Sequence, residues 1–145
     1  LNEDAKERAR NWYRNGQEWA WCEESEGSIL AFCERFGVTL KYSGISPDYP
    51  ISYSTDATNA HFRGLKLKDV DRDAMPTGYC LDCTLWYTFH DEFKRTGDAY
   101  AAFDAAVYAG LKDWRSDLES QTEDDYIDDA ITANEYEFNE DGSRA

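Results

Sequence analysis

Apolar residues near the N-terminus recur every three or four positions, which is the spacing of one helix face. Over residues 3–15 the positions on this face are Ala5, Ala9, Trp12 and Tyr13. Gly16 follows as a breaker, and residues 17–24 are expected to be helical again. A further helix is predicted from Ser28, a suitable N-cap, to Gly37, a glycine that suits a helix C-terminus.

After Gly37 the apolar period falls to two, which is typical of strands. Short strands are predicted at 38–42, 51–54 and 62–67, the last with Gly64 as a bulge or point of close approach. Residues 81–90 give the clearest alternation. Its inward positions are Leu81, Cys83, Leu85, Tyr87 and Phe89. These patterns predict a small antiparallel sheet of three or four strands.

The C-terminal third returns to helical spacing. From residue 98 onward one apolar stripe runs for about twenty residues, which predicts a long helix packed on the sheet. The stripe comprises Tyr100, Phe103, Val107, Leu111, Trp114 and Leu118. Thr122, with Asp125 three residues later, predicts the start of an acidic helix that ends at Asn134. Residues 136–138 predict a short extended end.

Together these elements predict an α+β protein. It has N-terminal helices, a small antiparallel sheet of three or four strands, a long C-terminal helix and an acidic helix. The chain has 145 residues, a length typical of one domain, so we expect a single domain over residues 1–145.

The net charge and the distribution of apolar residues limit the kinds of molecule that the protein is expected to bind. The chain has 30 acidic and 15 basic residues, which gives a formal net charge of −15. A surface of that sign repels phosphate, so direct binding to nucleic acid or to an anionic membrane is not expected. No apolar run approaches the roughly 18 residues of a membrane span, and the charged start lacks a signal-peptide pattern. We therefore expect a soluble, cytoplasmic protein.

The negative charge is concentrated towards the C-terminus, where residues 113–145 hold 12 acids and 2 bases. One interpretation is a solvated helix that keeps the protein soluble. The other is an acidic face for a basic partner, for instance a protein that itself holds nucleic acid. The candidate partner-binding residues are Asp117, Glu119, Glu123, Asp124, Asp125, Asp128 and Asp129.

Three tryptophans, Trp12, Trp19 and Trp21, lie within ten residues of one another. We expect them to be buried, because aromatic clusters usually anchor the core of a small domain. An exposed pair would instead indicate a docking hot spot.

The four cysteines include Cys80 and Cys83 in a CxxC pattern, which raises zinc or redox chemistry. On the predicted strand, residues three apart point to opposite faces, so the two thiols would diverge. No second CxxC and no histidine pair accompanies them. We therefore expect free, buried cysteines, with no metal and no cofactor.

Other candidate chemistry is weak. The acidic segment that begins at Asp69 departs from a calcium loop, with Ala74 at its sixth position and Cys80 at its twelfth. His61 and His90 lie in no nucleophile motif, although His90 with its acidic neighbours could serve acid–base chemistry. We assign no catalytic residue and do not expect an enzyme.

The segment from Ala133 to Gly142 reads ANEYEFNEDG. It resembles the ending of a family of small, mostly uncharacterised phage and prophage proteins, some of which are labelled antitoxin of a toxin–antitoxin stability system. In that family a long aromatic helix and an acidic helix precede the ending, and residues 114–131 fit this layout. Members also have an I-x-[YF]-S strand that leads through a glycine-rich turn to F-x-G. Residues 51–64 match both motifs, but this chain lacks the turn glycines. The resemblance implies a phage origin.

Three functions are compatible with these observations. The first is a phage-encoded, anti-CRISPR-like inhibitor, whose acidic helices mimic nucleic acid and bind a host defence protein such as a CRISPR effector or a restriction enzyme. The second is an antitoxin-like protein that neutralises a basic toxin, and the third is a small enzyme with an unrecognised site. We favour the first, with a basic host protein or a protein–nucleic-acid complex as partner in the bacterial cytoplasm. The sequence leaves the oligomeric state open.

Overall fold

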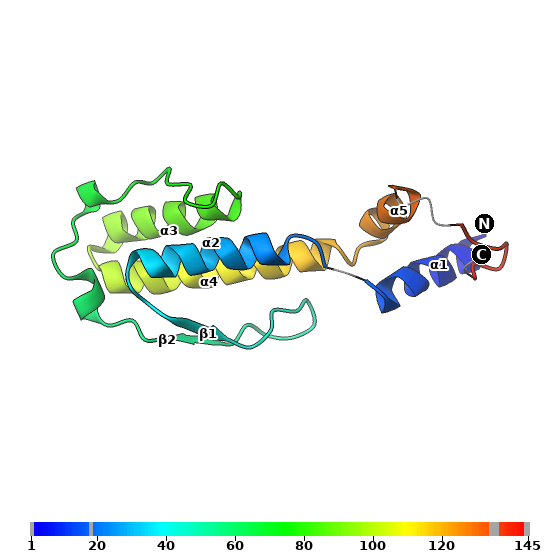
Figure 1. Cartoon of the computed structure of the whole chain (residues 1–145), viewed down its shortest axis with the longest axis horizontal. Coiled ribbons are helices and arrows are strands. Elements are labelled where there is room, and N and C mark those ends of the chain that lie inside the picture. The colour runs from blue at the N-terminus through cyan, green and yellow to red at the C-terminus, as the bar shows by residue number, and fades with distance from the viewer. Residues whose placement is uncertain (1, 18, 134–136, 144–145) are drawn as a thin grey trace. The chain divides into compact units, whose positions relative to one another are not determined.

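A computed structural model describes residues 2–17, 19–133 and 137–143. The chain divides into two compact units (Figure 1). The first unit is drawn from Leu1–Ala20 and Asp117–Ala145, and the second is Trp21–Ser116. The expectation of one domain over residues 1–145 stays a prediction, because this division does not show whether either unit folds alone.

Three long helices build the second unit: α2 (Cys22–Arg35), α3 (Leu81–Thr96) and most of α4 (Ala99–Ser120). Their shared core is aromatic. Phe32 is fully buried, stacks on Phe103 with 5.4 Å between ring centroids, and meets Phe89 edge-on at 5.8 Å. Offset and edge-to-face ring contacts of this kind add to the free energy gained by burying the rings.

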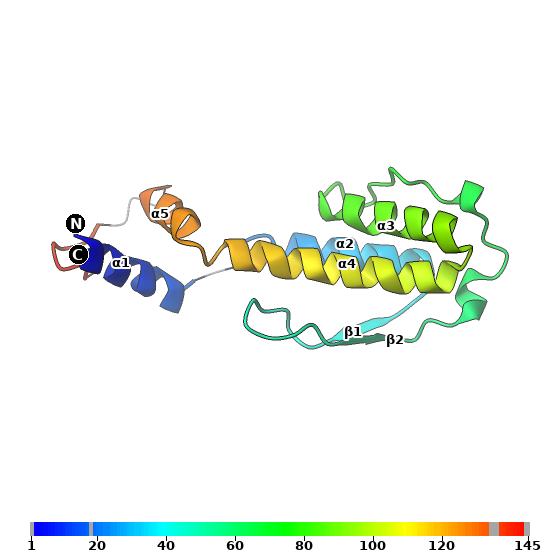
Figure 2. The ribbon, with the colours of Figure 1, turned by 180° about the vertical axis from the view of Figure 1, so that it is seen from behind.

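A two-stranded antiparallel hairpin completes the second unit. It pairs β1 (Leu40–Tyr42) with β2 (Tyr53–Thr55), so that Tyr42 lies opposite Tyr53. Figures 1 and 2 place the hairpin and α3 on opposite sides of the α2–α4 pair. Tyr42 packs edge-on against Trp114 of α4 at 5.8 Å, and the Tyr53 hydroxyl donates to Asp104 at 2.9 Å.

The predicted sheet of three or four strands is therefore too large, since the described residues form only these two. The segment predicted most clearly as a strand, 81–90, is the first part of α3. The reason lies in the spacing: Leu81, Leu85 and Phe89 are four residues apart, a step that fits both a helix face and every second position of a strand. Trp86 distinguishes the two, because a strand would place its side chain on the solvent side, whereas it is buried in the structure.

Two other local predictions are wrong. Residues 62–67 do not form a strand; short 3₁₀ turns, Asn59–Phe62 and Leu67–Asp69, occupy this region. Ser28 is not an N-cap, because α2 already begins at Cys22. Of the described residues between 17 and 24, only 22–24 are helical. Ser28 is instead buried inside α2, with its hydroxyl 3.0 Å from that of Thr77.

The first unit brings together the N-terminal and acidic helices. Helix α1 (Glu3–Asn15) begins where predicted, and the Asn2 side chain caps it by accepting from the Ala5 amide at 2.8 Å. Helix α5 (Asp124–Ala133) packs against α1. Its start differs from the prediction, because the Thr122 hydroxyl donates back to the Glu119 carbonyl and does not cap the helix.

Predictions for the chain's end fall partly on residues that the structure does not describe. The proposed C-cap Asn134 and Tyr136 lie outside the described ranges. The predicted helix from residue 98 is confirmed as α4, although Tyr100 of its stripe is exposed. Within the described ranges, no helix is both long enough and apolar enough to cross a membrane.

Candidate functional site

All seven candidate partner-binding residues belong to the first unit, at the end of α4, along α5 and, for Glu123, just before α5. Residues 117–145 contain 11 acids and 1 base, whereas residues 1–20 contain 4 of each. Residues 1–20 are therefore neutral overall, but Arg10 and Arg14 lie on α1, the helix that packs against α5. The local contacts decide which carboxylates remain available to a partner.

Asp124 and Asp128 face α1. They are four residues apart on α5, so they share one side of the helix. Arg10 binds Asp128 in a bidentate manner, with both N–O distances at 2.9 Å, and lies 3.5 Å from Asp124. Arg14 contacts Asp124 at 2.5 Å. Glu7 joins the network through both arginines.

Within this network, the contact between Arg10 and Asp128 favours the charged forms of these two residues. The hydrogen bonds from Arg10 lower the pKa of Asp128, and the same contact raises the pKa of Arg10. A bidentate arginine–carboxylate pair fixes relative orientation as well as charge. Asp124 and Asp128 therefore hold α5 on α1, and their charge is compensated there although about half of each side chain is exposed.

Asp117 is also engaged inside the unit. Its carboxylate accepts from the Gln121 side chain at 2.9 Å. Gln121 is 1% exposed, and its amide pairs with both backbone groups of Ala20, at 2.9 and 3.0 Å. Because a buried amide without partners is unfavourable, this arrangement gives Asp117 a structural role. Glu119 lies exposed on the last turn of α4.

Glu123, Asp125 and Asp129 are exposed, and their side chains contact no cationic group among the described residues. Asp125 and Asp129 are four residues apart, on a side of α5 distinct from that of Asp124 and Asp128. The fully buried Ile127 anchors α5 to the rest of the unit. The structure thus divides the predicted acidic set into carboxylates that build the unit and carboxylates that face solvent.

The ending that carries the family resemblance packs on α1. Phe138 meets Trp12 edge-on at 5.5 Å, and Arg8 donates to the Asp141 carbonyl at 3.1 Å. Gly142 is buried with φ +88°, and a Cβ there would lie 2.2 Å from the Ala5 carbonyl oxygen. Only glycine combines that conformation with so close an approach. The described part of the motif therefore has a structural role.

The prediction of buried tryptophans is wrong. Trp12 and Trp19 are each 39% exposed in the first unit, and Trp21 is 56% exposed in the second. Trp21 stacks on Tyr79 with 5.9 Å between ring centroids, so Tyr79 covers one face of the indole while the rest of the side chain is exposed. The core that the tryptophans were expected to supply is built by phenylalanines from α2, α3 and α4.

The premise used for the CxxC pattern is also wrong. Cys80 is the N-cap of α3 and Cys83 lies in its first turn, so the two residues share a helix side and do not diverge. Cys80 is exposed and Cys83 half-buried; only Cys33 is buried, and burial raises its pKa to about 12. Across the described ranges no three potential metal ligands gather. The absence of a metal stays a prediction.

The two histidines have local partners. His61 Nδ1 accepts from the Thr58 amide at 2.9 Å, which closes a 3₁₀ turn. His90 contacts Asp91 at 3.0 Å, and hydrogen bonds from Arg72 and then His90 lower the pKa of Asp91 to about 2. A local hydrogen bond explains the position of His61 and a structural ion pair that of His90, so neither residue is assigned to catalysis.

The sequence analysis did not predict that α1, which carries Arg10 and Arg14, packs against the acidic helix α5. Arg10 and Arg14 are spaced by four, as are Asp124 and Asp128, and this matched spacing of opposite charges was the available signal. Comparisons of the chain with protein-family models, with curated proteins and with solved structures found no match.

Proposed function

We propose that the protein is a non-enzymatic inhibitor that occupies the cationic groove of a nucleic-acid-handling host protein. The contacting residues are Glu123, Asp125 and Asp129, and the partner is a defence protein of the CRISPR-effector or restriction-enzyme type in a bacterial cytoplasm. This proposal rests on one observation: the three carboxylates are exposed and form no ion pair with a described cation, whereas Asp124 and Asp128 of the same segment pair with Arg10 and Arg14.

The ion pairs with α1 give the proposed surface two useful properties. First, they reduce the electrostatic repulsion among the four aspartates of this ten-residue helix. Second, they hold α5 in place, so that binding has to order fewer groups than it would in a flexible acidic tail. Complementary charge also accelerates encounter with a cationic partner.

The test is affinity capture from a bacterial lysate, with three forms of the full chain as bait. The forms are the native protein, the variant E123Q/D125N/D129N, and the control E23Q/E24Q/D48N, which removes three exposed acids of the second unit. The proposal expects a nucleic-acid-binding protein that the native form and the control retain and the first variant loses. Added duplex DNA should displace it, because both ligands compete for the groove.

Other outcomes would contradict the proposal. Equal capture by all three forms would show that the charge serves solubility only. A captured basic toxin that DNA does not displace would favour an antitoxin-like function for the same surface.

A further inference from the structure

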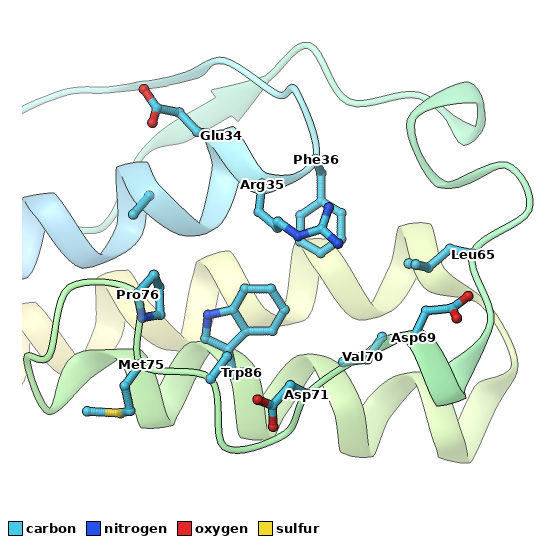
Figure 3. A pocket seen from close by; sticks show the side chains of 12 residues that line it. Glu34, Arg35, Phe36, Leu65, Asp69, Val70, Asp71, Met75, Pro76 and Trp86 are labelled. Carbon is cyan, nitrogen blue, oxygen red and sulfur yellow. The ribbon is translucent and has the colours of Figure 1, made fainter.

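The second unit contains a pocket of about 700 Å³ between the end of α2, the middle of α3 and the segment 65–76 (Figure 3). Its floor and walls are mainly apolar, with Trp86 and Phe36 as the aromatic groups and Pro76, Met75 and Val70 around them. This volume lies in the range of small-molecule sites, which are typically apolar with a few placed polar groups.

The first polar group is the indole N–H of Trp86. Trp86 is 6% exposed, and its Nε1 is buried with no hydrogen-bond acceptor among the described residues. Buried indole nitrogens usually find an acceptor, and leaving such a donor unpaired is unfavourable. Because almost none of this nitrogen is accessible in this arrangement, an oxygen atom on a bound molecule would supply that acceptor only after a shift of the Trp86 ring.

The second polar group is the guanidinium of Arg35. It lies 5.9 Å from the centre of the Phe36 ring, in front of that ring and above Trp86 in the view of Figure 3. Among the described residues it forms no ion pair, whereas Arg10 and Arg14 of α1 are paired with carboxylates. Arginine combines stacking on aromatic rings with planar recognition of anions.

The acids around the pocket do not neutralise Arg35. Asp69 accepts from the Lys66 amide at 3.1 Å, and Asp71 accepts from the Asp73 amide at 2.9 Å. Figure 3 shows the Glu34 side chain directed away from Trp86. Accepting one backbone N–H does not remove the charge of a carboxylate, so the anionic group of a ligand would lie at Arg35 and away from Asp69 and Asp71.

A shallower hollow of about 390 Å³ adjoins this pocket and shares Arg35, Phe36, Leu65 and Asp69 with it. Its lining adds Arg63 and His61. The Nδ1 atom of His61 accepts from the Thr58 amide, which leaves Nε2 as the donor. In a chain of net charge −15, this is a local concentration of cationic and donor groups.

We infer that the pocket binds a small organic anion with an aromatic body. The rings of Trp86 and Phe36 contact the body, and Arg35, with Arg63 beside it, binds the anionic group. This inference is independent of the acidic surface, because its residues all lie in the second unit. A charge-assisted hydrogen bond supplies enough free energy to discriminate an anion from its neutral analogue by about tenfold or more.

The test uses two fluorescent probes that share one ring system. They are 8-anilinonaphthalene-1-sulfonate and N-phenyl-1-naphthylamine, which lacks the sulfonate. We expect the full chain to bind the sulfonate with one-to-one stoichiometry and at least tenfold more tightly than the neutral probe. R35Q should weaken sulfonate binding at least tenfold and leave the neutral probe unchanged. R95Q, which removes an exposed arginine outside the pocket, should have no such effect.

A second readout tests the position of the probe. The side-chain N–H signal of Trp86, assigned by its loss in W86F, should move on titration with the sulfonate, while the other indole signals stay in place. Equal affinities for the two probes, equal effects of R35Q and R95Q, or an unmoved Trp86 signal would each overturn the inference. Circular dichroism of each variant checks that the helices are intact.

Discussion

Asp82 shows how a single buried carboxylate organises the second unit. It is fully buried in the first turn of α3 and accepts from the Thr77 amide at 3.0 Å, the Thr77 hydroxyl at 2.9 Å and the Gly78 amide at 3.1 Å. These bonds hold the loop that precedes α3 against the helix. Buried charges are tolerated when donors surround them in this way.

Removing the Asp82 carboxylate should therefore destabilise the protein strongly. We expect D82A to lower the free energy of unfolding by about 2 kcal/mol, since two backbone donors and a hydroxyl lose a charged acceptor. Urea unfolding followed by circular dichroism measures the change. D73A, at an exposed acid of the same loop region, is the control and should change the value by less than about 0.5 kcal/mol. Equal effects of the two substitutions would contradict this role.

Asp128 gives a prediction about pH. Arg10 lowers the pKa of Asp128 in the folded chain below its value in the unfolded chain. Its contribution is therefore complete above the unfolded pKa, about 4, and disappears as the pH falls through the folded pKa. D128N should be less stable than the native protein by about 1 kcal/mol at pH 7, with a difference that vanishes in strong acid.

Stability curves between pH 2 and pH 7 test this prediction, with D129N as the matched control. Asp129 is one residue away and faces solvent, so its substitution should change stability little at any pH. A difference between D128N and the native protein that persisted in strong acid would show that the Arg10 contact is not its cause.

At the scale of the elements, two glycines inside helices should respond oppositely to alanine. Gly27 in α2 has open space where a methyl group would lie, so G27A should raise stability by about 0.5–1 kcal/mol through helix propensity. At Gly110 in α4 the same methyl would lie 2.6 Å from Leu85 Cδ2 of α3 and 3.4 Å from Ile29 of α2. Overpacking should outweigh propensity there, and G110A should lower stability by about 1 kcal/mol.

Thermal unfolding of the two variants provides the measurement. Stabilisation by both substitutions would show that α2, α3 and α4 pack less closely around Gly110 than the structure indicates.

The elements also show what the sequence could predict. Helices α1 and α4 are predictable because their apolar residues recur every three or four positions, a spacing that only a helix fits. Helix α3 is not, because Leu81, Leu85 and Phe89 satisfy both periods, and only Trp86 and Asp82, buried on the same helix, distinguish them. Tertiary contacts therefore decide the secondary structure of this segment.

The candidate site was predictable to a similar degree. The acidic residues form an obvious group in the sequence. Which of them are paired inside the unit and which face solvent cannot be predicted from it. Which carboxylates meet Arg10 and Arg14 depends on the packing of α1 against α5, across more than 100 residues of sequence. The pocket over Trp86 could not be anticipated either, because the expected strand placed Trp86 on the solvent side.

At the scale of the whole molecule, the two units carry different chemistry. The first holds a net charge of −10, with exposed carboxylates on and just before α5. The second holds the remaining −5, with an aromatic core and a pocket whose Arg35 forms no ion pair with a described residue. The proposed function depends on Glu123, Asp125 and Asp129 meeting a cationic surface.

The most direct test is the dissociation constant for the captured partner, measured by calorimetry at about 50 and about 300 mM salt. Native protein and the control E23Q/E24Q/D48N should bind alike, with affinity that falls steeply as salt rises. E123Q/D125N/D129N should bind at least about tenfold more weakly at low salt and depend less on salt. Equal affinity and equal salt dependence for all three proteins would contradict the account.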